Sequence, residues 1–93
     1  MNRKEILEDA ESKITGQRAE DYGDATENFQ RVADLWSPIF GQEVTIAQVV
    51  QAMICLKLSR LINSPEHTDT WVDVAGYAAL GGEIYDLERK QSD

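Results

Sequence analysis

Charged side chains stand at helical spacing on both sides of a short turn, between positions 57 and 77 of the sequence. Lys57 and Arg60 are three positions apart, so both project from one face of a helix. Asp69, Asp73 and Tyr77 follow at intervals of four and share one face of the next helix. The short connection between the two helices favours antiparallel neighbours. We therefore expect the cations and the carboxylates near the same end of a helical hairpin.

This cluster has two interpretations, and the sequence leaves both open. In the structural one, the two cations pair with the two aspartates to close the hairpin, and His67 caps the turn. In the functional one, Lys57, Arg60 and His67 bind phosphate or another anion. Asp69 and Asp73 then hold a divalent cation through carboxylate oxygens, or orient the cations. Lys57 lies in the most apolar helical segment, where an unpaired charge is expensive to bury, which favours a specific partner for it.

The segment "RAEDYGD", residues 18–24, carries a second group of polar side chains. Arg18, Asp21 and Tyr22 supply a guanidinium, a carboxylate and a stacking ring, which suit the phosphates, ribose and base of a nucleotide. The alternative is an ordinary polar turn, in which Gly23 provides a positive φ and Asp24 caps the following helix.

The composition excludes several classes of protein. The chain has 9 Lys and Arg against 17 Asp and Glu, a net charge of −8, which opposes nucleic acid as a partner. The single Cys55 excludes an internal disulfide and suits a reducing cytosol. No apolar run reaches the roughly 20 residues of a membrane span, and the polar start lacks a signal-peptide core. We therefore expect no membrane partner and a cytoplasmic location.

Helical periodicity occurs in four segments, and no segment alternates with the period of a strand. The predicted helices are 3–15, a second from about 24 that ends or kinks at Pro38, before Gly41, and then 46–62 and 69–90. Thr45 and Gln48 form a capping box at the third start. Apolar residues on most sides of 46–62 indicate a central, nearly surrounded helix. The sequence predicts one all-α domain, 1–93, a bundle of about four helices with a central antiparallel helical hairpin.

Small residues gather in the last predicted helix. Gly76, Gly81 and Gly82 each cost about 1 kcal/mol relative to alanine in a helix interior, so something should compensate. With the alanines at 75, 78 and 79, they form a surface on which another helix can lie close. A chain this short buries only about 60–65% of its unfolded surface, so a partner should help its stability. We expect a homodimer or larger homo-oligomer that forms through this surface.

Several motifs carry a family resemblance that spans residues 10 to 83. The stretches "RAEDYGD", "ENF", "ADLW", "LKLSRL" and "DTWVDVAGYAALGGE" resemble a family of small phage-encoded and prophage-encoded proteins, called MazG-like or left without a function. More distantly, the chain is similar to the all-α nucleoside triphosphate pyrophosphohydrolases of the MazG and dimeric dUTPase kind. Those enzymes carry an ExxE pair on one helix and an ExxD pair on the next. Together these carboxylates bind magnesium ions that activate water against the α–β phosphate bond.

The chain departs from this enzyme pattern at both acidic pairs. Asp69 and Asp73 correspond to the later pair with a spacing one residue longer, and Gln48 and Gln51 stand where the earlier carboxylates belong. Neutral amides do not hold a two-metal cluster in the same way.

The leading expectation is therefore a MazG-like pocket without the complete hydrolytic centre. It binds a nucleotide or another phosphorylated small molecule through seven residues: Arg18, Asp21, Tyr22, Lys57, Arg60, His67 and Tyr77. One alternative is a nucleoside triphosphate pyrophosphohydrolase with Mg²⁺ on Asp69 and Asp73. Another, implied by the phage resemblance, is a protein that sequesters a host nucleotide immune signal or binds a host protein.

Overall fold

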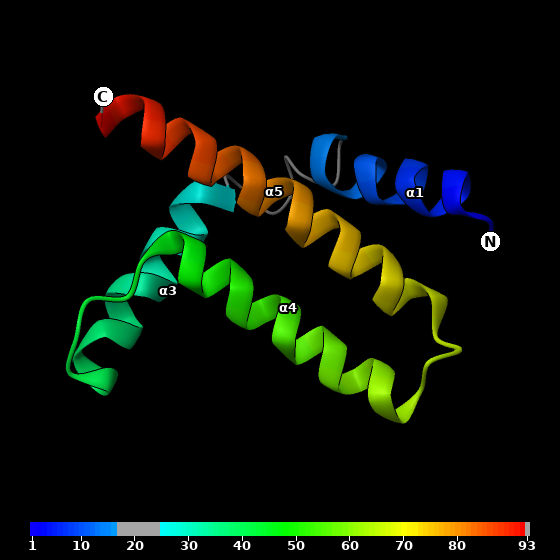
Figure 1. Ribbon diagram of the computed structural model, residues 1–93, viewed down its shortest axis with the longest axis horizontal. Helices are drawn as coiled ribbons and strands as arrows, with labels where there is room; N and C mark the ends of the chain where they lie inside the picture. Colours follow the sequence, from blue (N-terminus) through cyan, green and yellow to red (C-terminus); the bar gives the residue numbers. More distant parts are fainter. Residues whose placement is uncertain (17–24, 93) are drawn as a thin grey trace.

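The computed structural model describes residues 1–16 and 25–92, and these residues form four α-helices without a strand. They are α1 (Arg3–Thr15), α3 (Ala25–Phe40), α4 (Ile46–Asn63) and α5 (Thr68–Ser92). α4 and α5 form an antiparallel hairpin, α1 lies along α5, and α3 packs against α4 (Figure 1). The predicted all-α bundle with a central helical hairpin is confirmed.

Capping boxes fix the starts of α1 and α4. The side chain of Asn2 accepts a hydrogen bond from the amide of Glu5 at 2.9 Å, and Glu5 accepts one from the amide of Asn2 at 3.2 Å. Thr45 and Gln48 exchange the same two bonds at 3.1 and 3.0 Å. Each box satisfies two amides that have no partner within the helix. The predicted start at Thr45 is confirmed.

The end of α3 lies beyond Pro38. We expected the helix to end or kink at Pro38, before Gly41, and it does not end there but continues to Phe40. Pro38 lies in the last turn, where its missing amide removes only one helical bond. Gly41, with a φ of 68°, then takes the left-handed conformation that ends the helix. This lets the amide of Gln42 donate to the carbonyl of Ser37 at 3.3 Å.

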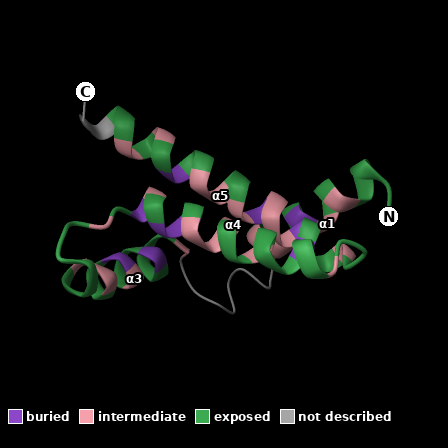
Figure 2. Ribbon diagram, turned by 60° about the horizontal axis from the view of Figure 1, so that its bottom comes forward, coloured by how far each residue is buried: buried purple, intermediate pink, exposed green. Residues whose placement is uncertain are grey.

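The largest buried cluster lies where α3, α4 and α5 meet, and its members are Phe29, Ala33, Ile46, Val49, Val50 and Ile84. The expectation that the helix 46–62 is nearly surrounded is wrong, because many positions of α4 are exposed (Figure 2). Leu58 and Ile62, for example, have exposed fractions of 44% and 86%. The reason is that α1 packs along α5 and leaves one side of α4 uncovered.

By length and composition alone, α4 is apolar enough to cross a membrane. This is weak evidence, because the core helix of a protein outside the membrane passes the same test. The absence of a membrane partner therefore stays a prediction.

Two of the three glycines of α5, Gly76 and Gly81, serve contacts within the chain rather than a free surface. A Cβ atom added at Gly81 would lie 2.8 Å from Cγ1 of Val50 on α4, closer than real Cβ contacts allow. Gly76 is buried, and a Cβ there would lie 3.5 Å from Cγ2 of Ile14 on α1. Gly82 has open space around it. The small-residue surface that we expected to mediate association is thus partly occupied by α4 and α1.

The adjacent glycines of α5 provide a matched test of this close approach. Alanine improves helix propensity by about 1 kcal/mol at either position. We expect Gly82→Ala to raise the Tm by about 4–8 °C, the shift typical of that energy in a domain of this size. Gly81→Ala should lower the Tm, because overpacking against Val50 costs about 1–3 kcal/mol. Thermal unfolding followed by circular dichroism checks both variants, and an equal rise for the two would contradict the close α4–α5 contact.

Candidate functional site

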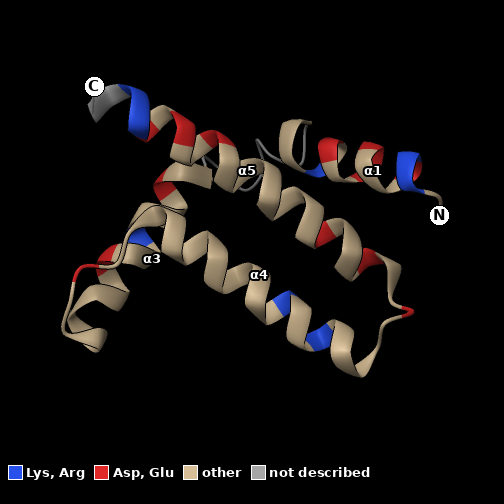
Figure 3. Ribbon diagram, in the orientation of Figure 1, with Lys and Arg blue, Asp and Glu red and all other residues tan. Residues whose placement is uncertain are grey.

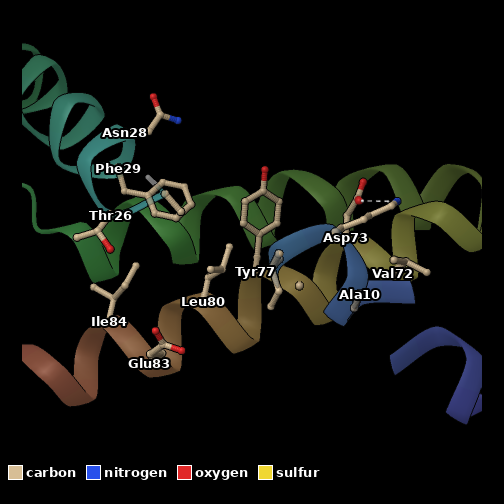
Figure 4. Close-up of a pocket in the computed structure, with 14 residues that line it drawn as sticks. Ala10, Thr26, Asn28, Phe29, Val72, Asp73, Tyr77, Leu80, Glu83 and Ile84 are labelled. Atoms are coloured by element: carbon tan, nitrogen blue, oxygen red, sulfur yellow. Dashed lines mark ion pairs between the residues drawn. The ribbon is translucent and has the colours of Figure 1, made fainter. Parts of the chain in front are cut away.

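A cavity of about 560 Å³ lies between α1, the start of α3 and α5 (Figure 4). Apolar side chains form most of its wall: Ala10, Ile14, Phe29, Val72, Leu80 and Ile84. Asp73 lies at one end and Glu83 at the other, with Tyr77 between them (Figure 4). The volume is in the range of sites for small molecules, about 300–1,000 Å³, and such sites combine apolar walls with a few polar groups.

Two lysines converge on one carboxylate at the Asp73 end of the cavity. Nζ of Lys57 on α4 lies 3.1 Å from Oδ2 of Asp73, and Nζ of Lys13 on α1 lies 3.6 Å from Oδ1. The three side chains are 15%, 26% and 30% exposed for Lys57, Lys13 and Asp73, so solvent screens them only in part. The cluster joins three helices and carries one positive charge in excess.

Helix register explains how the sequence builds this cluster. Ala10 is buried, and Lys13 follows it by three positions. Lys13 therefore lies on the same side of α1 as Ala10. Sequence reasoning missed Lys13 as a site residue, although this register relation to the apolar residues of its helix was visible. Lys57 meets Asp73, because the basic positions of α4 and the acidic positions at the start of α5 lie on facing stretches of the hairpin (Figure 3).

The other residues of the predicted cluster lie outside the cavity wall. Arg60 and Asp69 are exposed, and neither makes an ion pair with any residue that the structure describes. Nδ1 of His67 lies 2.9 Å from Oγ1 of Thr70, a hydrogen bond across the first turn of α5. The pairing of cations with aspartates that we considered for the whole cluster therefore occurs for Lys57 and Asp73 but not for Arg60 and Asp69.

Tyr77 is the predicted site residue that the structure places in the middle of the cavity wall. Its ring centroid lies 6.3 Å from that of Phe29, at an interplanar angle of 49°. Within residues 1–16 and 25–92, no hydrogen-bond partner is found for its hydroxyl group. Phe29 and Asn28 also line the cavity, and sequence reasoning missed both as site residues. Arg18, Asp21 and Tyr22 lie outside the described residues.

The carboxylates of the described residues do not fit the magnesium site expected for the enzymatic alternative. Both oxygens of Asp73 face ammonium groups, which would repel a divalent cation. Asp69, one turn away, is exposed, and no group of three or more His, Cys, Asp or Glu side chains in the described ranges is placed to hold a metal. Since Mg²⁺ requires oxygen ligands in near-octahedral geometry, no hydrolytic step follows from these residues.

Comparison with known proteins gives a family and two phage relatives. Residues 5–85 match the family described as "Domain of unknown function (DUF6378)". The Gene 55 protein of Mycobacterium phage L5 is 50% identical over 76 residues, which cover 81% of this chain and 49% of the relative. The Gene 55 protein of Mycobacterium phage D29 is 37% identical over 81 residues, 87% of this chain and 54% of the relative. No solved structure is significantly similar.

These comparisons confirm the resemblance to small phage-encoded proteins of unknown function. The chain spans about half the length of the curated relatives that it matches. A link to the MazG-type enzymes finds no support in these matches and stays a prediction.

Replacing each cation of α4 by methionine separates the paired charge from the unpaired one. Lys57→Met keeps the apolar stem but removes the nearer partner of Asp73, so we expect a loss of about 1–2 kcal/mol, between the values for surface and buried pairs. Arg60→Met should change stability by less than about 0.5 kcal/mol. Asp73→Asn leaves two ammonium groups facing each other and should cost more than Lys57→Met.

Urea unfolding of the three variants and the parent measures these differences. Equal effects of Lys57→Met and Arg60→Met, or a stabilising effect of Asp73→Asn, would contradict a structural role for the ion cluster.

Proposed function

The chain belongs to the DUF6378 family, and we propose that it binds a nucleotide-like phosphorylated small molecule in the cavity between α1, α3 and α5. The observation that carries this proposal is the cluster of two lysine ammonium groups around one carboxylate, at the end of a cavity whose wall includes the rings of Phe29 and Tyr77. Its excess positive charge is half-buried, and charge-assisted hydrogen bonds to phosphate are stronger than neutral ones. A phosphate group would balance that charge.

The arrangement of polar groups favours one orientation of the ligand. The phosphate lies at Lys13, which lines the cavity beside Asp73. The base contacts the rings of Phe29 and Tyr77, and the hydroxyl of Tyr77 donates to the ligand. Glu83 at the other end repels a phosphate and accepts hydrogen bonds from a ribose hydroxyl or an exocyclic amine.

Binding without turnover is the outcome that the described residues support best. The carboxylates that a magnesium-dependent pyrophosphohydrolase needs are not assembled among them. The relatives are phage proteins, which are made in the infected host cell. We propose that the chain acts in the host cytoplasm, where holding a nucleotide would lower its free concentration, as in the sequestration of a host immune signal.

Thermal-shift measurements against mono-, di-, tri- and cyclic nucleotides, with and without Mg²⁺, identify the ligand. A ligand at 100 times its Kd stabilises the folded chain by about 2.7 kcal/mol, enough for a clear rise in Tm. We expect at least one nucleotide to raise the Tm and to be recovered intact by chromatography. Recovery of monophosphate and pyrophosphate would instead establish hydrolysis, and no stabilisation by any nucleotide would contradict the proposal.

Two lysines of α1 then test the position of the phosphate. Lys13→Met removes a charge from the cavity and should weaken nucleotide binding by about tenfold to a hundredfold, the 1.5–3 kcal/mol of a charge-assisted bond. Lys4→Met is the control, since Lys4 pairs with Glu8 on the exposed surface of the same helix at 3.9 Å. Calorimetric titration measures both affinities, and equal effects of the two substitutions would exclude Lys13 as a phosphate ligand.

A further inference from the structure

One side of the α4–α5 hairpin carries exposed side chains without a charge. On α4, the exposed residues Gln51, Cys55, Leu58 and Ile62 follow one another at intervals of four, three and four, and therefore form one stripe. On α5, Trp71, Ala78, Gly82 and Tyr85 form a second stripe with intervals of seven, four and three. We call these two stripes together the open face. It has no Lys, Arg, Asp or Glu, although 28% of the chain is charged.

The two stripes lie side by side rather than on opposite surfaces. A hollow of about 270 Å³ runs between the helices and is lined by Gln51 from α4 and by Ala78, Gly82 and Tyr85 from α5. The α5 contacts to α1 use another side of the helix, where Gly76 faces Ile14. The open face is therefore one continuous surface that no helix of the described chain covers.

Large apolar groups dominate this surface. The exposed fractions are 86% for Ile62, 58% for Tyr85, 47% for Trp71 and 44% for Leu58. Neighbouring exposed apolar side chains of this size are typical of surfaces that bind another protein.

We propose that the open face is the interface of a symmetric homodimer. A twofold interface joins the same patch on both copies, so the patch has to be compatible with itself. Each copy carries a net charge of −8, and an uncharged face lets two such chains meet without like charges in direct contact. The interval pattern of the α4 stripe is that of a helix seam that packs against another helix. Two hairpins facing each other form a four-helix layer, with α1 and α3 outside it.

This proposal changes the surface that we expected to mediate association. Gly76 and Gly81 contact α1 and α4 within the chain, whereas Leu58 and Ile62 of α4 join Trp71 and Tyr85 of α5 in the interface. The dimer does not depend on the proposed nucleotide, because no residue of the open face lines the cavity, and the hollow between the two stripes shares only Tyr77 with it.

Sedimentation equilibrium at low to high micromolar concentration tests the dimer. We expect the parent chain to have the dimer mass at high concentration, and Leu58→Glu to have the monomer mass with unchanged helicity. Ile62→Glu is a second variant at a more exposed position, in case Leu58→Glu fails to fold. Leu7→Glu is the matched control, because Leu7 is 63% exposed on α1, away from the open face, and this variant should stay dimeric.

The exposed Cys55 adds an independent measurement, since it is the chain's single cysteine and lies on the α4 stripe. Its maleimide labelling should slow as the concentration of the parent chain rises, and this protection should disappear in Ile62→Glu. A monomer at every concentration would overturn the proposal, and so would a dimer that survives both glutamate substitutions. A monomer that sediments with phosphatidylcholine vesicles would assign the open face to a membrane surface instead.

Discussion

The arrangement of three helices depends on the two ion pairs that the carboxylate of Asp73 makes. The oxygens of Asp73, a residue of α5, lie 3.1 Å from Nζ of Lys57 on α4 and 3.6 Å from Nζ of Lys13 on α1. A half-buried charge without a partner is unfavourable, so each of these helices is held in the rotation that brings its charged group to this point. The same cluster leaves one positive charge in excess at the end of the cavity between α1, α3 and α5. The packing of the three helices and the proposed binding of phosphate thus depend on the same three side chains, Lys13, Lys57 and Asp73.

Close packing of α5 on α4 sets the second constraint. Because Gly81 has no side chain, Val50 approaches the backbone of α5 directly. α1 then packs along α5, and α3 packs against α4. This distribution leaves a cavity between α1, α3 and α5, and it leaves the opposite face of the hairpin uncovered. The cavity suits a small molecule, whereas the two exposed stripes of the uncovered face carry no charged residue and suit another copy of the chain.

Much of the fold was predictable from local sequence patterns. The capping box at Thr45 and the apolar periodicity gave the helices, because these features act within a few residues of one another. Pro38 does not end α3, since the left-handed conformation of Gly41 marks the end of the helix. The exposure of α4 was also mispredicted, because the apolar composition of a helix does not determine how many other helices pack against it.

The candidate site was predictable only in part. Helix spacing was sufficient to bring Lys57 and Asp73 together, and Tyr77 follows Asp73 by one turn on the same face. Lys13 and Phe29 join the cavity from elements far away in the sequence, and helix periodicity alone does not show which helices become neighbours. The roles of Arg18, Asp21 and Tyr22 stay predictions, because they lie outside the described residues.

The central claim is that Lys13 meets the phosphate of a bound nucleotide, and a thermodynamic cycle tests it most directly. The affinities of a nucleoside and of its phosphorylated form are measured by calorimetry, for the parent chain and for Lys13→Met. If the claim holds, the parent prefers the phosphorylated ligand and most of this preference disappears in Lys13→Met, a coupling that indicates direct contact. The same preference in both proteins would contradict the claim.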